Sequence, residues 1–144
     1  MSIITSIRHH LGLARAFGLP GATSLAFRRR FGVRKAMKLR WHNDRVIVRP
    51  VESDPVVASA ILGWAEYALS NRAQSALSGL AARWRAKGAT PVIMDGGANV
   101  GYAALYFAHA FPDATIIAVE PNPETFRILQ ENCAAIPQSM MTTS

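Results

Sequence analysis

The second half of the chain alternates short apolar runs with apolar stripes at helical spacing. Pro91–Met94 and Thr115–Val119 are two largely apolar runs, and each is followed at once by an acidic residue. Short runs of this kind are typical of buried strands. Apolar residues between them follow one helix face: Val100, Ala104, Phe107, Ala108 and Phe111. Strands joined by one helix must run parallel with a right-handed crossover, so the pattern predicts an α/β fold.

A further helix is expected after the second run. Asn122-Pro123 predicts its start, because asparagine caps free amides and proline suits the first helical position. Its buried face is expected to contain Phe126, Leu129, Cys133 and Ile136. Residues 137–144 are polar and without a pattern, so we expect a disordered tail there.

The first 50 residues predict two helices and a β-hairpin. Apolar residues behind Ser2 predict an amphipathic helix that ends near Gly18-Leu-Pro20, followed by a second helix over Ala22–Phe31. Met37–Trp41 and Arg45–Val48 alternate in polarity and predict a hairpin. The stripe of the first helix contains Ile3, Ile4, Ile7, Leu11 and Ala14. Packing of this stripe in the core is favoured over contact with a membrane surface.

Residues 51–136 are expected to form a second region, which begins with two helices. Ser53-Asp54-Pro55 is a strong helix start, since a side-chain oxygen can cap the first free amides. The next helix is expected to end at Lys87-Gly88, where the lysine complements the helix dipole. Its apolar positions are Leu77, Leu80, Ala81 and Trp84.

Positive charge is concentrated in the N-terminal third. The 144 residues carry a formal net charge of +7, but residues 1–49 hold 11 of the 16 Lys and Arg residues and one acid, Asp44, a local net charge of +10. Such a segment most often forms a solvated surface; the alternative is contact with an anionic membrane surface or an acidic substrate. Nucleic-acid binding is not expected, because only Phe31 and Trp41 lie near the basic cluster as stacking platforms.

Cysteine content and targeting signals predict a cytoplasmic protein. The single cysteine, Cys133, excludes an intrachain disulfide and suits a reducing compartment. The sequence shows neither a transmembrane span nor the apolar block and cleavage site of a secretory signal. No metal site is expected, since the adjacent His9 and His10 point apart on a helix.

The glycine-containing loop after the first run has the properties of a nucleoside-binding loop. Gly96 and Gly97 allow a sharp turn and bring bare backbone against a ligand. Gly101 is expected on the first helical turn, where it would let the helix pack close to the sheet. Amides around Asn99–Val100 are expected at the helix N-terminus, which favours an anionic group.

The two acids indicate which nucleoside this loop binds. The glycine spacing does not match the dinucleotide fingerprint, and Asp95 at the strand end would repel a diphosphate. S-adenosylmethionine has no phosphate, and it offers an ammonium and a sulfonium to an acid and a carboxylate to the amides. Glu120 lies 23 residues beyond Gly97, at the end of the next strand, where a carboxylate can accept both ribose hydroxyls.

One stretch, residues 91–133, carries a family resemblance. Its motifs are Val92–Tyr102, Ala104–Phe107, Phe111-Pro112, Ala118–Pro123 and Phe126–Asn132. Together they resemble the FkbM family of class I methyltransferases. The resemblance implies a Rossmann-like fold, S-adenosylmethionine as cofactor, and O-methylation of a sugar, glycolipid or natural-product hydroxyl. It implies these cofactor-binding residues: Asp95, Gly96, Gly97, Ala98, Asn99, Gly101 and Glu120.

The sequence shows only the first βαβα unit of the seven-stranded sheet that this family has. We therefore expect a chain truncated at its C-terminus, with the third strand and the acceptor site outside it. The alternative is a non-catalytic remnant whose basic N-terminal region binds a membrane surface or a partner chain. An NAD-binding fragment is a weaker alternative, because the glycine spacing does not fit it.

Overall fold

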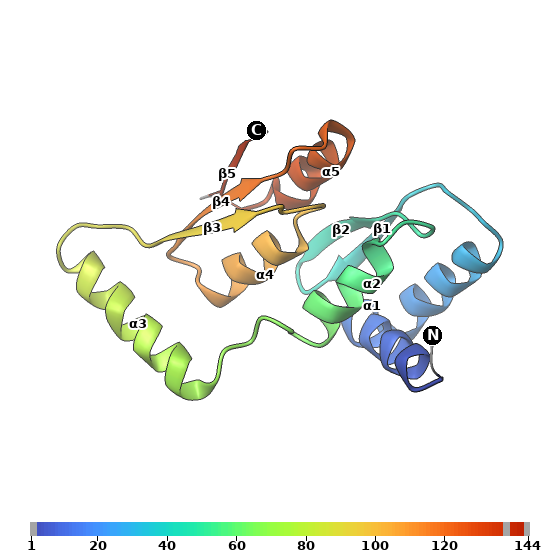
Figure 1. Cartoon of the computed structure of the whole chain (residues 1–144), viewed down its shortest axis with the longest axis horizontal. Helices are drawn as coiled ribbons and strands as arrows, with labels where there is room; N and C mark the ends of the chain where they lie inside the picture. Colours follow the sequence, from blue (N-terminus) through green and yellow to red (C-terminus); the bar gives the residue numbers. More distant parts are fainter. Residues whose placement is uncertain (1–2, 137–138, 143–144) are drawn as a thin grey trace. The chain divides into compact units, whose positions relative to one another are not determined.

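The computed structural model describes residues 3–136 and 139–142, and the chain divides into two compact units (Figure 1). Unit 1 is Met1–Glu66 and unit 2 is Tyr67–Ser144. Residues 54–63 belong to unit 1, because their helical turns pack on the N-terminal helix.

Unit 1 contains the two predicted helical segments, joined as one kinked helix, and the predicted hairpin. Helix α1 (Ile3–Arg30) is broken at Gly18, whose φ of 72° is non-helical, so its two helical segments match the two that were predicted. Strands β1 (Met37–Trp41) and β2 (Asp44–Val48) pair antiparallel, with Met37 opposite Val48. The hairpin and the break near Gly18-Leu-Pro20 are both confirmed, because local residues specify them: a turn between alternating segments, and a glycine two residues before a proline.

Close packing of α1 on two short helical segments builds the core of unit 1. These are α2 (Asp54–Ala58) and the π-helical turn η1 (Ser59–Gly63). Ser59 Oγ donates to the carbonyl of His9 at 2.9 Å, and Trp64 Nε1 donates to the carbonyl of Arg8 at 3.0 Å. A Cβ on Gly12 would collide with Ser59 and Trp64, so this approach requires glycine there.

The apolar stripe predicted to pack in the core lies on the surface. Ile4, Ile7 and Leu11 are 80%, 55% and 53% exposed, and α1 instead buries Leu13, Ala16, Ala22 and Leu25. The helix face that bears Gly12 is the one that can approach η1 most closely, and this contact determines which side of α1 turns inward. The core-packing prediction is therefore wrong for these three residues.

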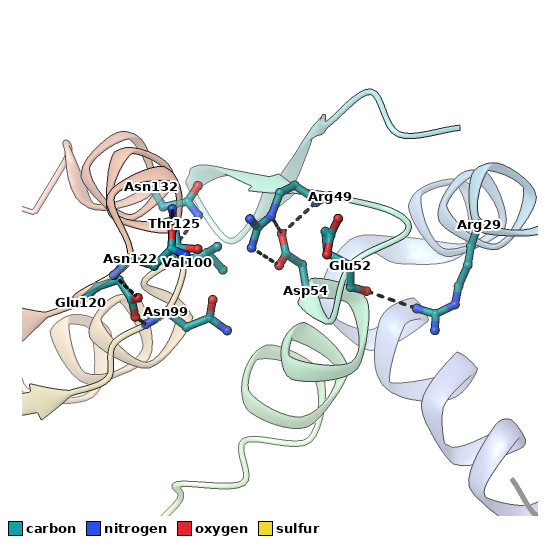
Figure 2. A network of polar contacts seen from close by, with 10 residues as sticks. All are labelled: Arg29, Arg49, Glu52, Asp54, Asn99, Val100, Glu120, Asn122, Thr125 and Asn132. Atoms are coloured by element: carbon teal, nitrogen blue, oxygen red, sulfur yellow. Dashed lines mark hydrogen bonds and ion pairs between the residues drawn. The ribbon is translucent and has the colours of Figure 1, made fainter. Parts of the chain in front are cut away.

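A buried ion pair fixes the start of α2, and the predicted serine cap is absent. Ser53 has helical backbone angles and its side chain makes no capping hydrogen bond. Asp54 is completely buried, and its carboxylate accepts from the backbone amide, Nε and a terminal nitrogen of Arg49 at 2.8–2.9 Å (Figure 2). Asp54 thus anchors the helix to the end of β2.

Unit 2 is built on a parallel three-stranded sheet. Its elements are α3 (Asn71–Arg85), β3 (Val92–Gly96), α4 (Tyr102–Ala110), β4 (Thr115–Val119), α5 (Pro123–Cys133) and β5 (Ser139–Thr142). The strand order is β3-β4-β5, and both pairs are parallel. This βαβαβ arrangement is the half-unit of Rossmann-like folds, so the predicted α/β class is confirmed.

The predicted tail contains a strand. Residues 139–142 form β5, which pairs with β4 from Ile116↔Ser139 to Val119↔Thr142. The expectations of a disordered tail and of a missing third strand are therefore wrong for these four residues. Residues 137, 138, 143 and 144 of that tail lie outside the described residues.

The two faces of the sheet differ in burial. The register places Ile93 and Asp95 beside Ile116 and Ala118, and the latter two are fully buried. Both crossovers step in the same direction, so right-handed connections place α4 and α5 on this same face. Val92 and Met94 point to the opposite face and are exposed. Asp95 therefore lies on the covered face of the sheet, at its carboxyl edge.

Helix α3 is a surface element. Ser70 caps its first turn by accepting the amide of Ala73, and none of its described residues is fully buried. Trp84, predicted as a packing residue, is 44% exposed. Among residues 3–136 and 139–142, no helix combines the length and apolar character needed to cross a membrane.

We predict that Arg49→Met destabilises unit 1 strongly. The substitution leaves the buried Asp54 carboxylate without its partner, which costs about 3 kcal/mol in the free energy of unfolding. Urea unfolding followed by tryptophan fluorescence in a Trp84→Phe background reports on unit 1, where Trp41 and Trp64 lie. The control is Arg45→Met on the exposed side of β2; equal losses in both variants would contradict the buried-pair argument.

Candidate active site at the carboxyl edge of the sheet

The predicted site residues gather where β3 and β4 end. Asp95 and Gly96 are the last residues of β3, Glu120 directly follows β4, and Ala98 to Gly101 form the loop between β3 and α4. Because parallel strands present their carboxyl ends at one edge, a strand order that joins β3 to β4 brings both acids to that edge.

The loop after β3 takes three left-handed backbone positions. Gly97, Asn99 and Gly101 have φ values of 76°, 51° and 86°. The amides of Gly97 and Ala98 both donate to the carbonyl of Val119 at 2.9 Å, which holds the loop against the end of β4. Gly96 stays in the strand with no positive φ, so of the two expected turn glycines only Gly97 makes the turn.

Helix α4 starts later than predicted. It begins at Tyr102, because the left-handed angles of Asn99 and Gly101 are incompatible with an earlier helical turn. The Asn99 amide is also already used, since it donates to a side-chain oxygen of Glu120. Of the amides around Asn99–Val100 that were expected to favour an anionic group, the amide of Asn99 is therefore occupied by the carboxylate of Glu120.

Glu120 joins the two loops of the site. Its Oε2 accepts from the amide of Asn99 and its Oε1 from the amide of Asn122, both at 2.9 Å (Figure 2). The residue is 8% exposed, so these two bonds compensate most of the cost of burying the carboxylate. A carboxylate has about four acceptor positions, so each oxygen keeps one for a further donor.

The end of α5 holds the loop from the other side. Asn132 is buried and its Nδ2 donates to the carbonyl of Val100 at 2.7 Å (Figure 2). Cys133 Sγ lies 3.8 Å from the carbonyl of Gly101. A Cβ on Gly101 would meet Cys133 Sγ at 2.8 Å. Gly101 therefore permits close packing on α5 and not, as expected, on the sheet.

Asn132 is a positioning residue to which the sequence analysis gave no role. It lies three residues after Leu129, which is fully buried on the same face of α5. A polar amide at the end of an apolar stripe is the signal that could have indicated it, since buried polar groups need partners. Cys133, by contrast, is buried as predicted.

Asp95 is the chemically distinctive residue of the site. Its Oδ2 is buried and has no hydrogen-bond partner within the described part of the chain. Burial raises the pKa of its carboxyl above the usual value, because desolvation penalises the charged form. A buried oxygen that no protein group satisfies is the expected mark of a place where a ligand supplies the donor.

The backbone next to Asp95 leaves room for a ligand. Apart from the glycine itself and its two chain neighbours, no atom of the described residues lies within 4 Å of the position that a Cβ would take on either Gly96 or Gly97. The site thus combines the Asp95 carboxylate, whose Oδ2 has no partner among the described residues, with open backbone at Gly96 and Gly97. A second carboxylate, that of Glu120, lies at the end of the neighbouring strand. The site can bind a cationic group next to a hydroxylated ring.

Comparison with known proteins gives partial matches to methyltransferases. No family model matches the chain. The protein named Methyltransferase sdnD from Sordaria araneosa is 43% identical over 44 residues, which are 31% of this chain and 17% of that protein. Methyltransferase 1 from Beauveria bassiana is 45% identical over 40 residues, 28% of this chain and 16% of that protein. The matches thus span about a sixth of the length of these curated relatives.

Among solved structures, one described as a caffeoyl-CoA O-methyltransferase from Staphylococcus aureus aligns with a TM-score of 0.36 and 17% identity. The alignment covers 59% of this chain and 42% of that one.

We predict that Gly101→Ala disrupts the close contact of Gly101, in the loop after β3, with Cys133 at the end of α5. The left-handed backbone costs about 1–2 kcal/mol for alanine, and the contact with Cys133 adds about 1–3 kcal/mol. Thermal unfolding should show a clear loss of Tm. The matched control is Gly79→Ala in α3, where the added methyl meets nothing within 4 Å and alanine favours the helix by about 1 kcal/mol. A decrease in Tm no larger than that of the control would contradict the close contact between Gly101 and Cys133.

Proposed function

We propose that this chain binds S-adenosylmethionine at the carboxyl edge of β3 and β4 and belongs to the FkbM-type methyltransferases. The single observation that carries the proposal is the buried Oδ2 of Asp95, which has no hydrogen-bond partner among the residues that the structure describes and lies beside open backbone. The partial matches to methyltransferases support the same reaction class.

The residues present fit this cofactor. Asp95 Oδ2 can accept from the cofactor's ammonium, and its negative charge suits the neighbouring sulfonium. Glu120 retains acceptor positions for the two ribose hydroxyls after binding the amides of Asn99 and Asn122. Gly96 and Gly97 leave the space in which the nucleoside lies against backbone.

The roles of the chain in the reaction are binding and orientation. The cofactor supplies an electrophilic methyl group on sulfur. Asp95 fixes the amino-acid end, Glu120 fixes the ribose, and the loop held by Asn132 keeps both in register, because methyl transfer depends on alignment of donor and nucleophile. The acceptor that we propose is a hydroxyl of a sugar, glycolipid or other natural product.

Calorimetric titration with S-adenosylhomocysteine tests the cofactor site. This ligand retains the ammonium and the ribose but carries no sulfonium charge. We predict that Asp95→Asn weakens binding about tenfold or more, because a charge-assisted hydrogen bond is worth about 1.5–3 kcal/mol. The matched control is Asp113→Asn, which removes an exposed carboxylate of the same unit from its ion pair with Arg85. Absence of binding to the folded protein, or equal affinities in both variants, would refute the site.

The raised pKa of Asp95 gives opposite pH effects on stability and binding. Between the ordinary pKa near 3.8 and the raised native pKa, the native state holds more protons than the unfolded state, so stability falls as pH rises. We predict that Asp95→Asn increases the free energy of unfolding at pH 7 but not below the ordinary pKa. Ligand affinity should decrease as pH falls through the native pKa, and this decrease should be absent in the variant. Urea unfolding and titration over a pH series check both effects; a variant less stable than the wild type at pH 7 would contradict the assignment.

A further inference from the structure

Unit 1 presents apolar side chains on the outer face of α1. Ile4, Ile7 and Leu11 occur at i, i+3 and i+7, so they form one aliphatic stripe on the first segment of the helix, and all three are exposed. Phe27 and Phe31 near its end are also exposed, with ring centroids 4.5 Å apart. Isolated exposed apolar residues are normal, but a stripe at helical spacing indicates an interaction surface.

Arginines border both apolar groups. Arg8 and Arg15 lie beside the aliphatic stripe by helical spacing, and their guanidinium carbons lie 5.7 and 4.2 Å from the Trp64 ring centroid. Arg28, Arg29 and Arg30 occupy the last turn of α1, next to the aromatic pair. Helices that lie in a membrane interface combine these features: aliphatic and aromatic side chains that enter the acyl boundary, and arginines that reach the headgroups from the flanks.

We propose that α1 binds the surface of an anionic lipid bilayer through the aliphatic stripe and the surrounding arginines. The inference is independent of the proposed cofactor site. Charge complementarity identifies the occupant, because residues 1–49 carry a net charge of +10 and Asp44 is their one acid. The helix lies on the bilayer and does not span it, in keeping with the absence of a spanning helix among the described residues.

Two other occupants fit the same surface less well. A second copy of the chain would bring two strongly basic helices together, and like charges disfavour that contact. A nucleic acid would bind the arginines but gains nothing from three exposed aliphatic side chains. Of these three occupants, only an anionic lipid surface binds both the aliphatic stripe and the arginines.

Vesicle flotation tests the proposal with the full chain. We expect the protein to float with vesicles of phosphatidylcholine that contain about a quarter phosphatidylglycerol, and to float poorly with phosphatidylcholine alone. Raising the salt from about 0.05 M to about 0.5 M should reduce binding, because it screens the headgroup attraction. Arg30 ends α1, and Arg34 and Lys35 follow it as exposed residues of the same basic segment. Replacing these three residues together (Arg30→Gln, Arg34→Gln and Lys35→Gln) should weaken binding at least tenfold.

A matched pair of triple variants isolates the stripe. The variant Ile4→Ser, Ile7→Ser, Leu11→Ser should lose flotation at both salt concentrations while it stays folded, since all three side chains are exposed. The control Val56→Ser, Leu77→Ser, Met94→Ser removes three exposed apolar side chains elsewhere and should float as the wild type does. Equal flotation of both triple variants, equal binding to neutral vesicles, or a stripe-dependent dimer in solution without flotation would overturn the proposal.

Discussion

The carboxylate of Glu120 is the interaction on which the architecture of the site depends. One of its oxygens binds the loop after β3 and the other binds the loop after β4, at Asn99 and Asn122. The amides of Gly97 and Ala98 hold the first loop against the carbonyl of Val119 at the end of β4, and the two loops are further fixed relative to each other through Glu120. Two charge-assisted bonds from one buried side chain supply that constraint, and Asn122 then caps α5 by accepting the amides of Glu124 and Thr125.

Contacts at the C-terminal end of α5 also hold the loop after β3 in place. Because α5 is held at its start by Asn122 and contacts the loop at its end through Asn132 and Cys133, the loop is fixed from strand and helix together. Left-handed positions at Gly97, Asn99 and Gly101 cost free energy, and they persist where such surrounding contacts determine them. Because this loop is rigid, it does not move to give Asp95 Oδ2 a hydrogen bond, and that oxygen has no partner among the described residues.

Local signals in the sequence predicted most elements, and long-range contacts account for the differences. Strand β4 and the Asn122 cap match their predictions, because an apolar run and an Asn-Pro pair specify them by themselves. The inward face of α1 was mispredicted, since it depends on the approach of Gly12 to Ser59 and Trp64, about fifty residues away in sequence. Strand β5 was missed because Ser139-Met-Met-Thr142 carries no strand pattern of its own and acquires its register from β4.

Asp95 and Glu120 differ in their hydrogen bonding in a way that their positions in the sequence did not predict. Each acid follows an apolar run, and the sequence does not indicate which of the two carboxylates is hydrogen-bonded within the protein. The structure shows that the two carboxylates differ in this respect. Glu120 is satisfied by backbone amides, so its removal acts first on the order of the loops. Asp95 lacks a partner for Oδ2 among the described residues, so burial of its charge is a cost to folding that protonation or a bound hydrogen-bond donor can offset. In the function that we propose, selectivity for a cationic ligand therefore rests on Asp95, and Glu120 holds the two loops that surround it in place.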